Sequence, residues 1–447
     1  MNKKVILFLA CLAQFIVIVD LAIVNVALPT IGQQMSLTSS ALQWIVVAYG
    51  LFFGGFLLMG GRLGDVLGRR KVLLSGLTLF TAASLVAGFA DSALVLIAAR
   101  AVQGLGAALI APSALGILAS TFAEGKERAK ALGVFGAVGG AAGSVGVVAS
   151  GLLTDGPGWQ WIFFINIPLG ALLIALALKN LPKETRTKNE RIDVLGAASV
   201  TGGLLAFIYG LNHAVEAGWT SPLTLGAFAV AILLFVVFWR SESRSSDPLV
   251  PFAALKNRTS SASLLIGLFT FGALFAFIYM TSLYMQQQLH FSPTQTGVAW
   301  LVMSVSSFAA SIFTGAKLLG RLSIKQLLFI SLSAMVVGVL WILRAPAEPM
   351  FMLDIVPTLL LMGIGGGMAI PAIQVGALTG VEPKRVGLIS GLAETTRELG
   401  AVVIIAGVTT AIVMQDALLA GFRAGFAVIA SAAILAIVIA AVVFRKK

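Results

Sequence analysis

Long apolar segments alternate with short polar connections along the whole chain. Each segment has about 20 residues, the length that an α-helix with a rise of 1.5 Å per residue needs to cross a hydrocarbon layer about 30 Å thick. No connection between them is long enough to form a separate soluble domain. We predict fourteen membrane-spanning helices, at residues 5–29, 41–60, 72–90, 93–112, 131–153, 162–180, 194–211, 223–239, 262–285, 297–316, 326–343, 350–371, 386–414 and 420–444.

Composition agrees with an all-α membrane protein. Hydrophobic residues make up 59% of the chain and charged residues only 11%, whereas soluble domains contain about 25% charged residues. The first apolar stretch follows a basic start, as in a signal peptide, but it continues to Pro29 without an A-x-A-like cleavage site; we interpret it as a retained membrane helix. The single cysteine, Cys11, excludes an internal disulfide and a thiolate metal cluster, and we expect no cofactor.

The distribution of lysine and arginine predicts the orientation. When the N-terminus is placed in the cytoplasm and the sides alternate, 26 of the 30 basic residues fall at inner segments. This asymmetry is what the positive-inside rule requires. We therefore predict a multi-pass protein of the cytoplasmic (inner) membrane with both termini in the cytoplasm. The same distribution explains the pI of about 10.1 by contact with the bilayer, without nucleic acid as a partner.

An eleven-residue pattern occurs twice. Residues 61–71 (GRLGDVLGRRK) follow the second predicted helix and residues 315–325 (GAKLLGRLSIK) follow the tenth; both begin at glycine and end at lysine. An offset of eight helices fits two six-helix halves with two helices inserted between them, and transporters built from parallel halves bind substrate between the halves near the midplane. We predict a first bundle at 1–181, two inserted helices at 182–258 and a second bundle at 259–447.

The first copy of this pattern combines a tight turn with opposite charges. Its glycines permit the turn, Asp65 supplies a negative charge, and Arg69, Arg70 and Lys71 are expected to anchor at lipid headgroups. A purely topological role explains the basic residues but not Asp65 or the glycines.

Residues 61–71 resemble the signature between helices two and three of the major facilitator superfamily. Residues 20–29 resemble the first-helix motif of its fourteen-helix drug:proton antiporter family, residues 100–112 resemble the fourth-helix motif, and residues 159–168 resemble the start of the sixth helix. The resemblance implies the major facilitator fold, a small-molecule substrate, coupling to protons and function as a monomer. It also ties the fourth-helix arginine, Arg100, to proton coupling.

The fifth predicted helix is rich in glycine, like the antiporter motif of that family, although Val147 stands where the motif usually has proline. Together with the loop at 61–71, this helix supplies the residues that we expect to control conformational change. These gating candidates are Gly61, Gly64, Asp65, Gly68, Arg69, Arg70, Gly143 and Gly146.

Ionisable groups inside the membrane are rare and costly, so each is a candidate for function. Asp20 lies about 24 Å along the first helix from Lys4, and Arg100 about 13 Å from the outer face, at 1.5 Å per residue. The two residues can therefore lie at the same depth in the membrane, either as a static ion pair or as a group that binds protons and substrate.

The thirteenth predicted helix carries a second charged group. Glu394 and Glu398 are separated by four residues and share one face, and Arg397 lies three residues after Glu394. These groups can exchange a proton within the membrane, or they can lie near the inner headgroups, because an uninterrupted apolar stretch follows them. The candidates for proton or substrate transport are Asp20, Asn25, Arg100, Gln103, Glu394, Arg397 and Glu398.

These patterns favour proton-coupled efflux of hydrophobic, cationic drugs by alternating access. A proton-coupled symporter that imports a small solute shares the expected fold and stays an alternative. A membrane-embedded enzyme or a channel fits less well, because the predicted helices contain no nucleophile–histidine–acid set and no filter-like loop.

Overall fold

The computed structural model describes residues 2–37, 39–182, 194–244, 257–345, 349–382, 386–415 and 417–443. Within these ranges fourteen helices are long and apolar enough to cross a membrane, which confirms the predicted number. The helices of the first half are α1 (Lys3–Gln34), α2 (Ser39–Leu67), α3 (Arg69–Gly88), α4 (Ala93–Thr121), α5 (Lys126–Asp155), α6 (Trp161–Phe164) and α7 (Asn166–Asn180). The remaining helices are α8 (Val194–Ala217), α9 (Pro222–Glu242), α10 (Arg258–Gln287), α11 (Pro293–Phe313), α12 (Ile324–Leu343), α13 (Val356–Leu378), α14 (Val386–Val413) and α15 (Leu418–Val443), with π-helical turns at Thr314–Leu318 and Phe351–Ile355.

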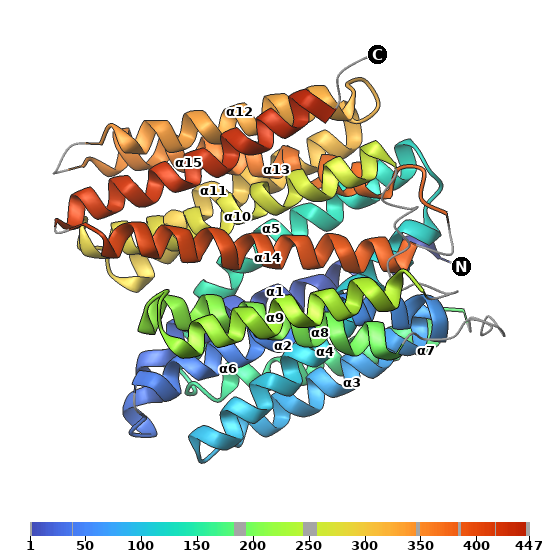
Figure 1. Ribbon diagram of the computed structural model, residues 1–447, viewed down its shortest axis with the longest axis horizontal. Coiled ribbons are helices and arrows are strands. Elements are labelled where there is room, and N and C mark those ends of the chain that lie inside the picture. The colour runs from blue at the N-terminus through green and yellow to red at the C-terminus, as the bar shows by residue number, and fades with distance from the viewer. Residues whose placement is uncertain are drawn as a thin grey trace.

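The helices form two bundles that lie side by side, α1–α7 and α10–α15 (Figure 1). Each bundle has an apolar core, and a core of the first bundle continues to Leu378, Val386 and Ile389 of the second. The bundles meet mainly where α5 contacts α11 and α2 contacts α14. Of the inserted helices, α8 packs against α9 and also reaches α2 and α14. The inserted pair therefore spans the seam between the bundles on the side of α2 and α14.

The start of α1 and the end of α15 lie at the same end of the molecule, on the right in Figure 1. We call this end the terminal side. An even number of membrane-spanning helices precedes each copy of the eleven-residue pattern. Both copies therefore also lie on the terminal side.

Three predicted spans end at a proline, and that boundary is wrong in each case. The first span ends at Pro29, but α1 continues to Gln34. Pro112 lies inside α4, which continues to Thr121, and Pro371 lies inside α13, which continues to Leu378. Neighbouring helices allow proline in a membrane helix by compensating the freed backbone groups. At Pro112 the carbonyl four residues earlier faces α2, where a Cβ on Gly60 would lie 2.2 Å from the Ala108 oxygen.

The sixth predicted span also differs from the structure, because two helices, α6 and α7, occupy it. α6 ends at Phe164 and α7 begins at Asn166, and Ile165 between them keeps helical φ and ψ angles of −60° and −26°. The side chain of Asn166, the first residue of α7, reaches the charged site described below.

Candidate functional site

The carboxylate of Asp20 is the centre of a buried polar network in the first bundle. It forms an ion pair with Nη1 of Arg100, and its Oδ1 accepts hydrogen bonds from Gln103 Nε2 at 3.2 Å and from Asn166 Nδ2 at 2.8 Å. Gln103 also donates to the Ser84 hydroxyl oxygen at 2.8 Å. Asp20 is fully buried and Arg100 is 1% exposed. A charge at such a position is stable only when it is paired and hydrogen-bonded, and both conditions are met.

Arg100 has partners besides Asp20. Its Nε donates to the Ile45 carbonyl oxygen at 3.2 Å, and Nη1 donates to Gln103 Oε1 at 3.0 Å. Its guanidinium carbon lies 4.2 Å from the ring centre of Tyr49, a position that favours a cation–π interaction. Arg100 would therefore keep part of its stabilisation if Asp20 became neutral.

Sequence reasoning predicted Asp20, Arg100 and Gln103 but missed the other members of this network. Ser84, Asn166 and Tyr49 come from α3, α7 and α2, and only packing of these helices brings them to Gln103, Asp20 and Arg100, respectively. The motif at 159–168 contained a signal for Asn166, since a polar side chain follows an apolar aromatic run there. The side chain of Asn25 lies outside the described part of the structure.

The second charged group is buried in α14, next to the seam between the bundles. Arg397 Nη2 lies 2.7 Å from Glu394 Oε2 and 3.2 Å from Glu398 Oε1, and the three side chains are 8%, 3% and 14% exposed for Arg397, Glu394 and Glu398. Protein therefore covers all three side chains on most sides. Glu398 also packs toward α2, where a Cβ on Gly54 would lie 4.0 Å from Glu398 Cβ.

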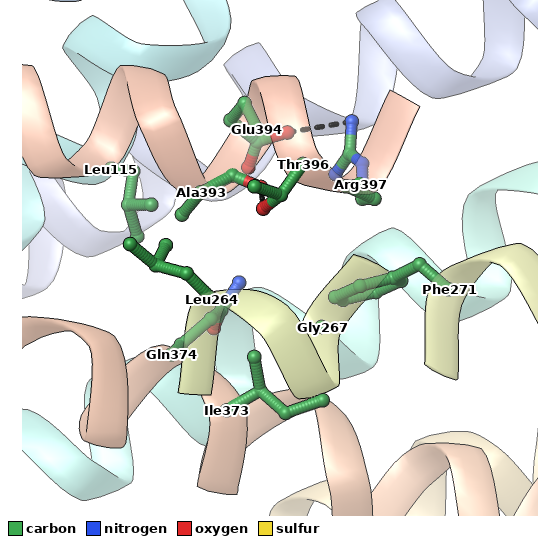
Figure 2. Close-up of a pocket in the computed structure, with 10 residues that line it drawn as sticks. All are labelled: Leu115, Leu264, Gly267, Phe271, Ile373, Gln374, Ala393, Glu394, Thr396 and Arg397. Atoms are coloured by element: carbon green, nitrogen blue, oxygen red, sulfur yellow. Dashed lines mark hydrogen bonds and ion pairs between the residues drawn. The ribbon is translucent and has the colours of Figure 1, made fainter. Parts of the chain in front are cut away.

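A small cavity lies beside this group, with a volume of about 20 Å³. Its walls come from α10, α13 and α14 of the second bundle and from Leu115 on α4 of the first (Figure 2). Its lining residues on these helices lie near the helix ends that face the terminal side. The polar groups at the cavity are Gln374, Glu394, Thr396 and Arg397, and Phe271 forms an apolar wall.

Helix α2 connects the two charged groups. Its Tyr49 packs on Arg100 and donates a hydrogen bond to the Val17 carbonyl oxygen at 3.2 Å. Five residues further along α2, Gly54 lies against Glu398. A shift of α2 therefore affects both charged groups.

The segment 61–71 is not the predicted loop, because α2 continues to Leu67 and α3 begins at Arg69. An ion pair links the two helices there. Gly68 has φ +95°, a conformation that favours glycine, and α3 begins at the next residue. Arg69 Nη2 lies 3.0 Å from Asp65 Oδ1, and Arg69 Nη1 donates to the Gly116 carbonyl oxygen at 3.3 Å. The prediction that Arg69 anchors at headgroups is therefore wrong, because its guanidinium turns inward to Asp65 and the end of α4. Arg70 also bonds to protein, donating to the Leu178 carbonyl oxygen at 2.8 Å.

The glycines of the gating set occupy different surroundings. A Cβ on Gly64 would be in ordinary contact with Arg69 at 3.6 Å, and one on Gly143 would meet nothing within 4 Å. Gly146 packs inside the first bundle, where a Cβ would lie 2.9 Å from Ala22 Cβ. Gly133, which was not predicted, faces the other bundle at Gly315.

In the described ranges no group of three or more His, Cys, Asp or Glu side chains is arranged to bind a metal ion. The chemistry available at the site is thus that of carboxylates, guanidinium groups and amides. Such groups can bind and release protons and can bind a polar or charged solute.

Comparison with known proteins shows the family to which this chain belongs. The sequence profile of the Major Facilitator Superfamily matches residues 10–405. The puromycin resistance protein pur8 of Streptomyces alboniger is 36% identical over 393 residues, which cover 87% of this chain and 77% of the relative. The methylenomycin A resistance protein of Bacillus subtilis (strain 168) is 32% identical over 386 residues, 86% of this chain and 82% of the relative.

Solved structures show the same fold at low identity. The human organic anion transporter MFSD10 (TETRAN) aligns with a TM-score of 0.70 at 16% identity, over 98% of this chain and all of that one. The proton:xylose symporter XylE aligns with a TM-score of 0.67 at 13% identity, over 98% of this chain and 94% of that one. The predicted fold class is confirmed, and so is the resemblance to drug-resistance transporters. The chain is a multi-pass membrane protein that belongs to the major facilitator superfamily.

Proposed function

We propose that this protein exports hydrophobic, cationic drugs across the cytoplasmic membrane in exchange for protons. The observation that carries the proposal is the buried ion pair of Asp20 and Arg100, held by Gln103 and Asn166 in a chain whose relatives are named for resistance to puromycin and methylenomycin A. Drug resistance conferred by a membrane transporter is most simply export. A buried carboxylate supplies the group that an antiporter needs to carry the proton.

The terminal side is cytoplasmic in this proposal. The distribution of 26 of 30 basic residues supports this orientation, and it puts the cavity beside Glu394 in the inner half of the membrane. A drug arriving from the cytoplasm or the inner leaflet would then meet the cavity before it passes Asp20. The protein acts as a monomer, since each chain has both bundles and the seam between them.

Proton coupling follows from competition for Asp20. While Asp20 is charged, Arg100, Gln103 and Asn166 all bond to it and hold α1, α4 and α7 together. Protonation removes the charge that attracts Arg100, which retains the Ile45 carbonyl oxygen and the ring of Tyr49 on α2. Coupling requires the proton affinity of this site to differ between the inward-open and outward-open states. Release of Arg100 toward α2 supplies that difference.

Inverted membrane vesicles test the proposal. The vesicles carry an imposed proton gradient, acid inside, and a fluorescent pH probe reports its decay after ethidium is added. Ethidium should dissipate the gradient with the wild type, but not with Asp20→Asn or Glu394→Gln. Asp91→Asn, which removes an exposed carboxylate, is the matched control and should behave like the wild type.

Two outcomes contradict the proposal. If lipophilic cations leave the gradient intact while a solute is taken up into right-side-out vesicles, the protein is an importing symporter. If the gradient decays without added solute, the protein is a channel.

A further inference from the structure

Ser84, on α3, contacts both of the amide side chains that bond to Asp20. Its Oγ accepts a hydrogen bond from Gln103 Nε2 at 2.8 Å and a longer one from Asn166 Nδ2 at 3.4 Å. Ser84 is fully buried, and in the described part of the chain no hydrogen bond joins it to Asp20 directly. An effect of Ser84 on Asp20 therefore passes through Gln103 and Asn166.

The hydroxyl of Ser84 can only accept hydrogen bonds from these amides. A serine hydroxyl has one hydrogen, and Ser84 donates it to the Phe80 carbonyl oxygen at 2.8 Å, one turn earlier on α3. An amide oxygen turned toward Ser84 would meet an oxygen lone pair with no hydrogen between the two atoms. Ser84 therefore requires both amides to point their NH2 groups at it, and excludes the reversed orientation of either side chain.

This orientation also directs N–H groups at Asp20. The Gln103 and Asn166 amide nitrogens both donate to Asp20 Oδ1, at 3.2 and 2.8 Å. Arg100 supports the same orientation, because its Nη1 donates to Gln103 Oε1 at 3.0 Å as well as to Asp20 Oδ2. Within the described ranges, all three groups bonded to the carboxylate are thus donors. Such bonds favour the charged form of a carboxylate, and the O–H group of a protonated Asp20 would lack an acceptor there, which costs free energy.

The other elements around Asp20 contribute little charge. Arg100 of α4 is its ion-pair partner, and Tyr49 of α2 packs on Arg100. α5, which also packs along α1, contributes Gly146 at this level, and the short helix α6 consists of apolar residues. The balance between charged and protonated Asp20 therefore depends on Arg100 and on the two amides that Ser84 orients.

We propose that Ser84 is a positioning residue of the proton site: it holds the N–H groups of Gln103 and Asn166 on Asp20 and so stabilises the charged carboxylate against protonation. The inference rests on the proposed proton-coupled export and names a residue that sets the pH range in which export works. A turn of the Gln103 amide would offer its Oε1 to the O–H group of a protonated Asp20. Ser84 and Arg100 both oppose that turn, and without the Ser84 hydroxyl only Arg100 does.

An infrared titration of the purified protein in nanodiscs, without substrate or gradient, tests the inference. The C=O stretch of protonated carboxyl groups is recorded as the pH is lowered, and the band that is absent from Asp20→Asn reports Asp20. Ser84→Ala should raise the midpoint of this band by about one pH unit, the value of one hydrogen bond to a charged group. Ser84→Thr keeps a hydroxyl that can bond to the carbonyl four residues earlier and should restore the wild-type midpoint.

Ser331→Ala is the matched control. Ser331, on α12 in the second bundle, is also fully buried, and its hydroxyl donates to a carbonyl oxygen of its own helix, that of Leu328 at 3.1 Å. Its removal should leave the midpoint unchanged. Ser84→Cys, whose thiol is a weak acceptor, should shift the midpoint in the same direction as Ser84→Ala even if Ser84→Ala is unstable.

A double variant tests whether Ser84 acts through its neighbour. Gln103→Leu removes the amide that makes the shorter bond to Ser84, so adding Ser84→Ala to Gln103→Leu should move the midpoint much less than Ser84→Ala does alone. A loss of stability without a positioning role would add to that of Gln103→Leu and would not depend on this amide.

Four results overturn the inference: an unchanged or lower midpoint in Ser84→Ala, an equal rise in Ser331→Ala, an undiminished shift in the Gln103→Leu background, or no Asp20-dependent band in any variant. The vesicle assay separates this inference from the export proposal. If ethidium dissipates the gradient while Ser84→Ala titrates like the wild type, the positioning role is wrong and the export proposal stands. If the midpoint rises as expected but no cation affects the gradient, Ser84 positions the site and the export proposal is wrong.

Discussion

Gly391 on α14 packs directly against Gly61 on α2. A Cβ on Gly391 would lie 3.1 Å from Gly61 Cα and 3.0 Å from the Leu57 carbonyl oxygen. On the other side of the seam, a Cβ on Gly133 of α5 would lie 2.9 Å from Gly315 Cα. Gly61 and Gly315 are the first residues of the two eleven-residue copies, so the repeat places one glycine from each bundle against the other bundle, on the terminal side. Contact of this kind closes the seam there.

A larger side chain at position 391 should therefore prevent closure on the terminal side. Gly391→Leu forces α14 away from α2, because the atoms it meets are backbone and cannot rotate aside. We expect transport to fall by about tenfold or more, in line with an overpacking cost of 1–3 kcal/mol. Labelling of cysteines introduced on the terminal side of the seam should become faster. Gly226→Leu, on the exposed face of α9 where a Cβ meets nothing within 4 Å, is the control; equal labelling in both variants would contradict this account.

The two predicted gating glycines of α5 should behave differently. Gly146→Val places a branched side chain against Ala22 and the Val19 carbonyl oxygen, at 2.9 and 3.0 Å from the Cβ, so it should destabilise the first bundle by about 1–3 kcal/mol. Gly143→Ala meets open space and should leave stability unchanged. Thermal unfolding in detergent compares the two, and a similar loss in both would show that the α1–α5 contact is not the cause.

Removing one partner of the Asp20–Arg100 pair should cost more than removing both. Asp20→Asn leaves the Arg100 charge buried without a counter-ion, and breaking a buried pair this way costs about 3–5 kcal/mol. The double variant Asp20→Asn with Arg100→Gln should recover a large part of that loss, but not transport. Unfolding midpoints give the stability and the vesicle assay gives transport. A double variant as unstable as the sum of the single ones would show that the two residues are not coupled.

The sequence predicted helices and charges better than it predicted their partners. Fourteen spans follow from apolar length alone, and the repeat at 61–71 and 315–325 predicted two halves. The spacing of Glu394 and Arg397 on one helix likewise predicted their contact, because residues three apart share a face.

Contacts between helices were not predictable in the same way. Asn166 reaches Asp20, and Ser84 reaches Asn166, only because α7 and α3 pack beside α1 and α4. Nothing in the local pattern marks Gln374 as a cavity residue. Gly391 was missed because one glycine among 48 has no signal until its neighbour Gly61 is known. Arg69 was misplaced because a basic residue at a helix start usually faces headgroups, whereas Asp65 one turn earlier turns it inward.

Accumulation of ethidium by purified protein in liposomes tests proton-coupled export most directly. An imposed pH difference, acid inside, is the only driving force, since valinomycin with equal potassium holds the membrane potential at zero. The account predicts that the wild type accumulates ethidium above its external concentration, that nigericin abolishes the accumulation, and that Asp20→Asn equilibrates ethidium without concentrating it. Accumulation that survives nigericin, or that persists in both Asp20→Asn and Glu394→Gln, would contradict it.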